Sequence, residues 1–355
     1  MINNKQKILI SGVQPSGRIH IGNWVGALQN WVRLQTNPDY QCLFFIADYH
    51  SLSSDYDPAE KREQIFELMV DLLALGLDPE KCLLFRQSDI LEHAELCWIF
   101  NTLTPMAFLE RMTQFKDKSG EQEKNINVGL FDYPVLQAAD ILMYRGEFVP
   151  VGRDQVQHVE LTRDIARFFN NKYGVQFFPE AKPLLTNVSK LRSLNDPLKK
   201  MSKSLGEKSY IALSDEPDVV LKKIKSMVTN TDGLITMTEK EIEDALTRPI
   251  TKKGEEELCG QAGILNLITL LRLFGSAEEA EQVIANQPLK YGELKPLVAK
   301  RVSDYFAEFR ERKTELMAKP HEVKEVFESG AERARALAAE TMKEVREIIG
   351  ITLKD

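Results

Sequence analysis

The stretch KILISGVQPSGRIHIGN, residues 7–23, runs from a short apolar segment through a turn of small residues to a histidine. Residues 7–11 are a predicted buried strand, and a helix is predicted to begin near Gly22. Gly17 and Gly22 have the spacing of a phosphate loop, but Asn23 and Trp24 stand where a Walker A loop needs Lys and Ser or Thr. The stretch does not match the dinucleotide pattern G-x-G-x-x-G either. It therefore predicts a strand, turn and helix of another nucleotide-binding type, or a turn with no ligand.

The histidine in this turn favours the functional interpretation. His20 is delivered to a helix N-terminus, where free backbone N–H groups and the helix dipole attract an anion. Gly22 allows a planar base to lie close against the backbone, because no side chain intervenes. The alternative is that glycine and proline merely shape the turn, and this stretch alone does not decide between the two.

Two further apolar runs extend the pattern into a sheet. Residues 42–47 and 82–85 are continuous apolar runs, as expected of strands buried on both faces. Between them, residues 58–75 repeat apolar side chains at helical spacing and stop at Gly76. Strands that alternate with helices predict an α/β fold with a doubly wound, Rossmann-like parallel sheet. In such a sheet the ligand lies at the carboxyl ends of the strands.

Length and composition set the limits. The chain has 355 residues, which allows about two domains. No apolar run reaches the roughly 18 residues of a membrane span, and the N-terminus has no secretory signal pattern, so we expect no membrane association. The four cysteines form no C-x-x-C pair. Scattered free cysteines predict a reducing, cytoplasmic location.

The second half of the chain has a different residue pattern. From about residue 205, helical patterns dominate and proline and glycine punctuate them. We interpret this region as an all-helical domain. The last predicted helix carries a long apolar stripe that must be buried against another element. The predicted helices are 214–228, 238–246, 263–273, 277–285, 290–317 and 320–349.

A basic segment lies between the predicted α/β region and the predicted helical region. Residues 182–208 carry seven basic and two acidic side chains, a net charge of +5, in a chain whose formal net charge is −7. Within it, residues 197–206 read PLKKMSKSLG, so that lysines alternate with serine hydroxyls. Such a loop can close over a polyphosphate and neutralise its negative charge as the polyphosphate leaves. The alternative is a lysine-rich linker.

Together, two motifs resemble those of class I aminoacyl-tRNA synthetases. Residues 20–23, HIGN, resemble the HIGH motif, and residues 200–204 match the KMSKS motif in every letter. The longer strings SGVQPSG (11–17), ERMTQFK (110–116), AADIL (138–142), VPVG (149–152) and ESGAE (328–332) are similar to those of the tryptophanyl-tRNA synthetases of bacterial type. The resemblance runs from the first strand to the last helix.

The resemblance implies an activity and a domain plan. Members of the family are ATP-dependent aminoacyl-tRNA ligases. They make tryptophanyl-AMP and pyrophosphate from L-tryptophan and ATP with Mg²⁺, and they then transfer tryptophan to the 3′ end of tRNA(Trp). They are homodimers, and we expect no structural metal. The implied regions are a catalytic domain (1–195), the KMSKS loop (196–206), a helical anticodon-binding domain (207–318) and a C-terminal helix packed back on the catalytic domain (319–355).

The resemblance also implies the catalytic and nucleotide-binding residues. Four side chains are expected to stabilise the transition state of adenylate formation: His20, Lys200, Ser202 and Lys203. The expected ATP site consists of Gln14, Pro15, Ser16, Gly22, Asn23, Gly152, Arg153, Asp154, Leu191, Lys200, Met201, Ser202, Lys203 and Ser204. The family usually has glutamate where Arg153 stands, so a side-chain contact from Arg153 is in doubt.

A tryptophan pocket needs an apolar slot and one acceptor for the indole N–H. Residues 133–141, YPVLQAADI, supply both, because Asp140 stands alone in an apolar helix and shares a face with Gln137. The alternative is an aspartate at the helix surface, or one bonded to Arg145 or a backbone amide. The resemblance implies that Asp140 accepts the indole N–H. The full set expected to bind tryptophan is Asp140, Tyr133, Gln137, Ile141, Val149, Val151, Gln155 and His50.

Three other polar residues have no expected role as ligands. His93, Cys97 and His158 are too dispersed in the sequence for a metal site, and His158 is interpreted as structural.

Two rival functions remain. A tyrosyl-tRNA synthetase shares the fold and both motifs, although the 12–15 turn and the 138–140 string favour tryptophan. A non-catalytic RNA-binding or regulatory paralogue is disfavoured, because His20 and the KMSKS motif are intact.

Overall fold

A computed structural model describes residues 6–112, 127–185, 191–235, 240, 261–286 and 288–352. The chain divides into two compact units. Unit 1 comprises Met1–Gly17, Asn30–Thr186 and Leu316–Asp355, and unit 2 comprises Arg18–Gln29 and Asn187–Glu315. The HIGH-like residues 20–23 and the KMSKS residues 200–204 therefore belong to the same unit.

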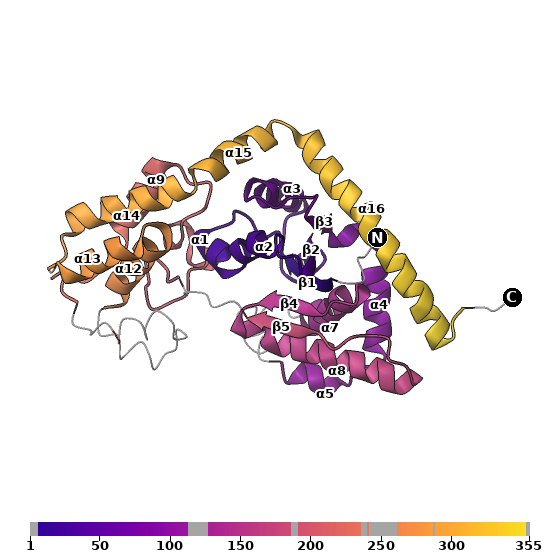
Figure 1. Cartoon of the computed structure of the whole chain (residues 1–355). Helices are drawn as coiled ribbons and strands as arrows, with labels where there is room; N and C mark the ends of the chain where they lie inside the picture. The colour runs from indigo at the N-terminus through magenta and orange to yellow at the C-terminus, as the bar shows by residue number, and fades with distance from the viewer. Residues whose placement is uncertain are drawn as a thin grey trace. The chain divides into compact units, whose positions relative to one another are not determined.

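Unit 1 is built on a parallel sheet of five described strands in the order β3-β2-β1-β4-β5 (Figure 1). Three of them, β1, β2 and β3, confirm the strands predicted from apolar runs. The two others were not predicted, because they are only four residues long and each contains a proline. The bounds are β1 Lys7–Val13, β2 Tyr40–Ile46, β3 Cys82–Arg86, β4 Phe148–Val151 and β5 Lys182–Leu185.

The strand order creates a position for a ligand. The chain proceeds from β1 outward through β2 to β3, then returns to the other side of β1 as β4 and β5. The order therefore reverses between β1 and β4, and a crevice opens outside the carboxyl ends of the strands at such a point. The Rossmann-like fold expected from the sequence is confirmed.

Local signals in the sequence set the ends of the helices of unit 1. Helix α3 begins after Asp57, whose carboxylate accepts the N–H groups of Ala59 and Glu60, and Pro58 occupies its first position. Helix α8 ends at Gly174, which adopts a left-handed conformation with φ of 66°. The helices are α2 Gln29–Leu34, α3 Pro58–Ala74, α4 Glu92–Asn101, α5 Met106–Glu110, α7 Val128–Met143, α8 Val156–Tyr173 and α16 Pro320–Ile349, with α2 running across the boundary between the units.

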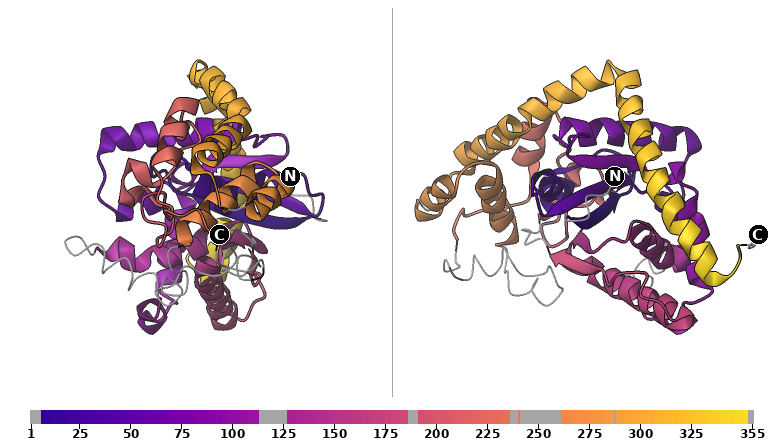
Figure 2. Two further views of the ribbon diagram at one scale, coloured as in Figure 1. Left: turned by 90° about the vertical axis from the view of Figure 1, so that its left-hand side faces the viewer. Right: turned by 45° about the vertical axis from the view of Figure 1, so that its right-hand side comes forward.

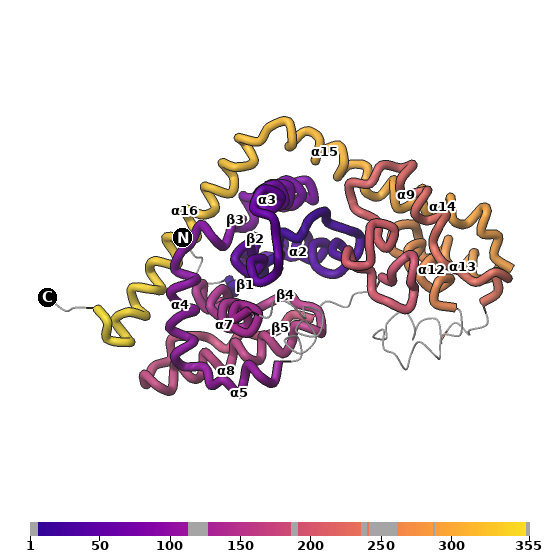
Figure 3. The backbone as a smooth tube through the Cα atoms, turned by 180° about the vertical axis from the view of Figure 1, so that it is seen from behind, coloured from indigo at the N-terminus to yellow at the C-terminus, as the bar shows by residue number. Residues whose placement is uncertain are grey.

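Helix α16 covers the β3 edge of the sheet. It runs beside β3 and α4, as the yellow helix in Figures 2 and 3 shows. Its predicted apolar stripe is the face that is buried, including Val323, Phe327, Ala334 and Met342. Gly330 lies on this face, and a Cβ built there would stand 1.7 Å from the carbonyl oxygen of Leu84 in β3. Only glycine allows the helix to lie this close to the strand.

Substituting Gly330 with alanine is therefore expected to destabilise unit 1. The added methyl group collides with a strand backbone that cannot move without breaking the sheet, so we expect a loss of about 2–3 kcal/mol in the free energy of unfolding. Urea unfolding followed by circular dichroism measures this loss. The matched control is Ser329→Ala, which changes the exposed neighbour on the same helix. Equal stability of the two variants would show that α16 does not pack as described.

Unit 2 is helical in its described part. The predicted helices 214–228, 263–273 and 277–285 are confirmed as α9, α12 and α13, and the predicted helix 290–317 breaks at Phe306 into α14 and α15. The predicted helix 238–246 lies outside the described residues. A short helix, α1, continues into a π-helical turn, η1. The bounds are α1 Ile21–Asn23, η1 Trp24–Leu28, α9 Pro217–Ser226, α12 Ala262–Phe274, α13 Ala277–Ala285, α14 Tyr291–Tyr305 and α15 Ala307–Met317, which crosses into unit 1.

The helical region confirms the second part of the predicted fold class. Across the part of the chain that the structure describes, no helix is long and apolar enough to cross a membrane.

Candidate functional site

The carboxyl edge of the sheet in unit 1 carries several of the predicted site residues. Gln14, Pro15 and Ser16 follow β1 directly, and His50 opens the 3₁₀ turn η2, His50–Ser53, which follows β2. Gly152 follows β4 and leads into the turn η4, Arg153–Gln155. Parallel strands end at a common edge, so segments far apart in the sequence come to the predicted crevice. Arg153 and Asp154 are exposed in this turn.

Asp140 is the centre of a buried polar cluster. Its side chain is 1% exposed, and both carboxylate oxygens are hydrogen-bonded. His50 Nε2 lies 2.8 Å from Oδ2, while His93 Nδ1 and Gln87 Nε2 lie 2.6 and 2.8 Å from Oδ1. On the far side of His93, Nε2 lies 2.9 Å from the hydroxyl of Tyr144. We call Asp140, His50, Gln87, His93 and Tyr144 the Asp140 cluster.

The cluster keeps Asp140 ionised. Burial raises the pKa of the carboxyl group, but the hydrogen bonds and charge interactions with His50 and His93 outweigh burial and hold the pKa below its usual value. A permanent acceptor is thereby maintained in an apolar helix. The predicted alternative partner, Arg145, is not in the cluster, because its guanidinium lies 2.5 Å from Glu344 on α16.

Sequence reasoning identified only Asp140 and His50 of the Asp140 cluster. Gln87 follows β3, and His93 is a buried residue on α4, so their approach to Asp140 depends on the tertiary fold. His93 stands between Glu92 and Glu95 in the first turn of α4, so no local pattern in the sequence marks it as a partner of Asp140.

The apolar residues of the predicted tryptophan pocket all belong to the core of unit 1. Ile141, Val149 and Val151 are buried in one core cluster of unit 1. The rings of Tyr133 and His50 are 6.3 Å apart in an edge-on arrangement, and the Tyr133 hydroxyl lies 3.0 Å from His158 Nε2. Burial raises the pKa of Tyr133 to about 12, so it stays protonated at neutral pH.

The remaining predicted tryptophan-binding residues are the two glutamines. Gln137 lies one turn before Asp140 on α7 and is half-buried, and Gln155 is half-buried in η4.

In unit 2, His20 is held by the backbone of a second segment. It forms an antiparallel bridge with Ala212, and the N–H of Ile21 donates to the carbonyl of Ile211 at 3.0 Å. The Gly22 N–H donates to His20 Nδ1 at 3.1 Å. This bond makes Nδ1 an acceptor, so the proton of the neutral ring sits on Nε2. The ring therefore presents an N–H donor on its other side.

The KMSKS loop is held by hydrogen bonds of its own residues, with Lys200 exposed and Lys203 half-buried. The N–H of buried Met201 donates to the carbonyl of Leu191 at 3.0 Å. The hydroxyl of Ser202 accepts the N–H of Ser204 and so begins the 3₁₀ turn η5, Lys203–Leu205. Gly206 follows with φ of 88°, a conformation that favours glycine.

The two motifs are electrostatically coupled within unit 2. Burial, followed by the positive charges of Lys203 and Lys200, lowers the pKa of His20 from 6.5 to about 4. The imidazole is therefore neutral at neutral pH. A neutral N–H donor beside two ammonium groups suits a polyphosphate, because it adds a hydrogen bond without a further charge that must be balanced.

The His20 ring is therefore expected to titrate near pH 4 in the folded protein. Its folded pKa is below its unfolded value, so the unfolded chain binds more protons and this contribution to stability is lost as pH falls from about 6.5 towards 4. NMR titration of the imidazole C–H signals, with His20 assigned from His20→Asn, measures the pKa. A midpoint near 6.5 for His20 would contradict the buried site beside the lysines.

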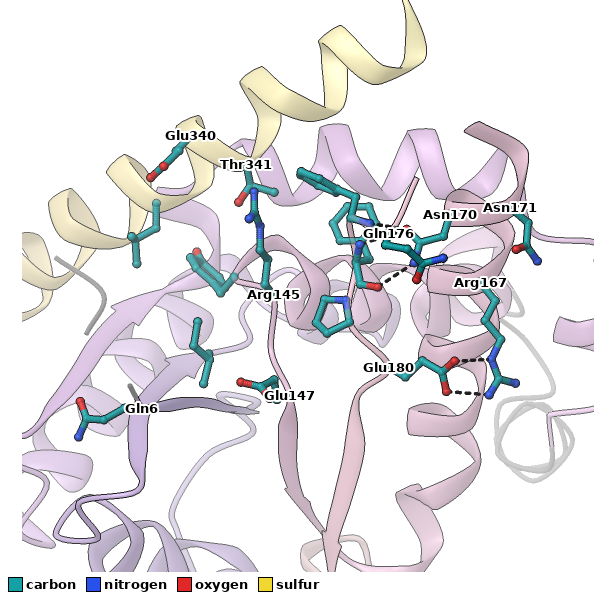
Figure 4. Close-up of a pocket in the computed structure, with 16 residues that line it drawn as sticks. Gln6, Arg145, Glu147, Arg167, Asn170, Asn171, Gln176, Glu180, Glu340 and Thr341 are labelled. Atoms are coloured by element: carbon teal, nitrogen blue, oxygen red, sulfur yellow. Dashed lines mark hydrogen bonds and ion pairs between the residues drawn. The ribbon is translucent and has the colours of Figure 1, made fainter. Parts of the chain in front are cut away.

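Unit 1 also contains a large cavity at the opposite edge of the sheet. It has a volume of about 890 Å³ and is lined by residues at the amino ends of β1, β4 and β5, among them Gln6 and Glu147. Figure 4 shows that Arg167 and Glu180 of this cavity form a double hydrogen bond at 2.9 and 2.7 Å. None of the predicted site residues lines this cavity.

The comparisons agree with the motifs. A family model described as class I tRNA synthetases (W and Y) matches residues 3–307. A tryptophan–tRNA ligase of Caldanaerobacter subterraneus is 41% identical over 98% of this chain and 100% of its own length. One from Wolinella succinogenes is 40% identical over 98% and 99%. A crystal structure of tryptophanyl-tRNA synthetase from Campylobacter jejuni with ADP and tryptophan superposes with a TM-score of 0.79, at 34% identity, over 97% of this chain and 99% of that one.

Proposed function

Because this chain belongs to the class I tRNA synthetases and, within them, to the bacterial tryptophan–tRNA ligases, we propose that its two groups of polar residues divide the reaction. The chain uses ATP and tryptophan to make tryptophanyl-AMP and transfers the tryptophan to tRNA(Trp). In our proposal, the Asp140 cluster of unit 1 selects tryptophan, and His20 with the KMSKS loop of unit 2 stabilises the phosphates.

The adenylation step needs no protein nucleophile. An oxygen of the tryptophan carboxylate attacks the α-phosphorus of ATP, the bond from that phosphorus to the bridging oxygen breaks, and pyrophosphate leaves. Catalysis then consists of alignment and charge stabilisation. The His20 Nε2–H and the ammonium groups of Lys200 and Lys203 are suited to the leaving pyrophosphate. The approach of the two motifs supports this assignment, since a Cβ built on Gly22 would lie 3.8 Å from Cβ of Met201, and the charges of both lysines help to lower the pKa of His20.

In the second step, a terminal ribose hydroxyl of the tRNA attacks the carbonyl carbon of the adenylate, and AMP leaves.

The ATP site is assigned to residues at the ends of two strands and in the His20 turn. They are Gln14, Pro15 and Ser16 at the end of β1, Gly152 at the end of β4, and Gly22 and Asn23 of the His20 turn. In unit 2, Leu191, Met201, Ser202 and Ser204 complete the assignment. Arg153 and Asp154 are exposed and are proposed to contribute through their backbone.

Tryptophan recognition is assigned to α7, η2 and β4. Asp140 accepts the indole N–H, and Ile141, Val149 and Val151 form the apolar wall. The wall leaves a tyrosine hydroxyl without a partner, which disfavours tyrosine because a buried unpaired hydroxyl is costly. Tyr133, Gln155 and His50 are assigned to the polar groups of the amino acid, and Gln137 lies one turn before Asp140 on the same helix.

We propose that Mg²⁺ is carried by the phosphates of ATP. The groups assigned to the phosphates are an imidazole N–H, ammonium groups and serine hydroxyls, which complement phosphate oxygens, whereas Mg²⁺ prefers oxygen ligands and retains several waters. The donor set therefore fits a nucleotide that brings its own ion, which would screen charge on the pyrophosphate.

The domain assignment is also a proposal. Residues 1–195 are assigned to catalysis, 196–206 to the mobile KMSKS loop, 207–318 to anticodon binding and 319–355 to the helix that packs on the catalytic region, with a cytoplasmic location for the whole chain. The support for the last region is the buried face of α16 against β3.

A test of this division compares substitutions in the two groups. Changes at the KMSKS loop are expected to lower the rate of adenylate formation, whereas changes in the Asp140 cluster are expected to raise the KM for tryptophan. If both kinds of variant change the same constant, the division is wrong.

We further propose a homodimer that uses an exposed apolar surface of unit 1. Leu91 and Trp98 of the α4 region, Met106 of α5 and Val128 of α7 are all exposed, and Trp98 is 71% exposed. Large apolar side chains exposed in one region indicate a protein interface. Buried Leu96 and Phe100 anchor α4 from behind, so Trp98 points away from the core.

Light scattering is expected to give about twice the chain mass of 40.5 kDa at micromolar concentration. Trp98→Glu is expected to reduce this to the mass of one chain, because a charge in an apolar interface is costly. The control is Val228→Glu, which places the same charge at an exposed apolar residue of unit 2. A wild-type mass near 40 kDa would rule out the homodimer, and an unchanged dimer in Trp98→Glu would rule out this surface.

A further inference from the structure

Three members of the Asp140 cluster have no role in the mechanism above: Gln87, His93 and Tyr144. His93 is fully buried on α4, and Tyr144, which follows α7, is 2% exposed. The side chains of His93 and Tyr144 make polar contacts, yet neither was assigned to ATP or tryptophan. Their rings lie 5.5 Å apart, and the aromatic rings of Phe45 and Phe85 surround His93.

The direction of each hydrogen bond in the chain follows from its ends. An ionised carboxylate can only accept, so the His93 Nδ1 that lies 2.6 Å from Asp140 carries a hydrogen. Burial raises the pKa of Tyr144 well above 10, so its hydroxyl keeps its proton. A hydroxyl that keeps its proton can donate to His93 Nε2, which lies 2.9 Å away, and such a bond favours the tautomer with the ring hydrogen on Nδ1. Tyr144 thus selects the tautomer that serves Asp140.

The distribution of donors on Asp140 is uneven. Oδ1 receives two donors, His93 Nδ1 and Gln87 Nε2, whereas Oδ2 receives one, His50 Nε2. A carboxylate oxygen accepts about two hydrogen bonds. Oδ1 is therefore saturated, and the remaining acceptor position is on Oδ2, on the side of His50.

We propose that His93, oriented by Tyr144, is a positioning residue for tryptophan specificity: it saturates Oδ1 of Asp140, so that Oδ2 is the oxygen that accepts the indole N–H. The inference rests on the proposed role of Asp140. A structural role for His93 as a core residue is the alternative. The two differ in one respect, because a positioning role concerns the indole N–H alone and a core role affects every substrate.

An analogue without the N–H separates these roles. 3-Benzothienyl-L-alanine has sulfur in place of the indole N–H and is otherwise close to tryptophan in shape. Amino-acid-dependent ATP–pyrophosphate exchange gives kcat and KM for both compounds in wild type, His93→Leu, His93→Asn and Asp140→Asn. Leucine has no donor, whereas the asparagine amide places an N–H near the position of Nδ1.

His93→Leu is expected to lower kcat/KM for tryptophan about 10- to 100-fold through KM, because a hydrogen bond to a charged acceptor is lost and Asp140 is no longer held. The same variant should stay within about threefold of wild type with 3-benzothienyl-L-alanine and with ATP. His93→Asn should recover most of the tryptophan preference. Tyr144→Phe should lower the preference for tryptophan over the analogue when it is introduced into wild type. It should have no such effect in His93→Asn, because that variant lacks the ring nitrogen to which Tyr144 is hydrogen-bonded.

Each contrary result has a definite meaning. An equal loss with both amino acids in His93→Leu, or no recovery in His93→Asn, shows a structural role and overturns the inference. If Asp140→Asn erases the preference for tryptophan over the analogue and His93→Leu retains it, the inference fails and the proposed role of Asp140 stands. If Asp140→Asn retains the preference, both fail.

Discussion

Lys203→Ala is expected to slow tryptophanyl-adenylate formation by about 10²–10³-fold while tryptophan binding stays unchanged. The positive charge of Lys203 contributes to the lowered pKa of His20, so we expect its ammonium group to act on the same phosphates as the imidazole N–H. Charge on the pyrophosphate increases as it leaves, and an ammonium group that meets it mainly in the transition state changes the rate rather than ground-state binding.

Single-turnover formation of the adenylate with saturating ATP and tryptophan measures this rate, and equilibrium dialysis measures tryptophan binding. Lys208→Ala is the matched control, because it removes an exposed lysine five positions later in the same basic segment. A rate for Lys203→Ala within a few-fold of wild type would show that the loop is a linker. A simultaneous loss of tryptophan binding would mean that the variant is misfolded, and Lys203→Arg, which keeps the charge, would then replace it.

The second large effect is expected at Asp140. Asp140→Asn should lower kcat/KM for tryptophan by at least about tenfold while the KM for ATP stays unchanged. The amide removes the negative charge that His50 and His93 stabilise, and it directs an N–H₂ group toward one of the three donors of the cluster. The acceptor for the indole is then weakened and displaced.

ATP–pyrophosphate exchange at varied tryptophan and varied ATP separates the two constants. Asp132→Asn is the control on the same helix, since Asp132 bonds Asn101 at 2.9 Å and has no part in the Asp140 cluster. An unchanged KM and unchanged selectivity for tryptophan in Asp140→Asn would remove this residue from the pocket. The ATP constant reports whether the catalytic fold survives.

The sequence was sufficient for the parts of the fold whose signals are local. Continuous apolar runs predicted β1, β2 and β3, and helical spacing with its stop at Gly76 predicted α3. Strands β4 and β5 have no such signal, because a four-residue strand with a proline gains its stability from pairing with neighbours. The break at Phe306 was missed for a similar reason, since the helical pattern continues through it.

The site divides in the same way. Motif spacing predicted His20 and the KMSKS loop, and an acid within the apolar run 133–141 predicted Asp140. The sequence could not predict the three other members of the Asp140 cluster, which are Gln87, His93 and Tyr144. Gln87 and His93 are hydrogen-bonded to Asp140 directly, across up to 53 positions of sequence, and Tyr144 is bonded to His93. Each of the three belongs to a different segment of the chain. Their role depends on hydrogen-bond geometry, which only the folded structure supplies.

ATP–pyrophosphate exchange with each of the twenty amino acids, measured singly on the wild-type chain, tests the central claim most directly. The account predicts rapid exchange with tryptophan, at least about tenfold slower exchange with tyrosine and phenylalanine at equal concentration, and background exchange with the rest. Exchange with tyrosine faster than with tryptophan would contradict the assignment of the Asp140 cluster, and the absence of exchange with every amino acid would contradict the assignment of His20 and the KMSKS loop to catalysis.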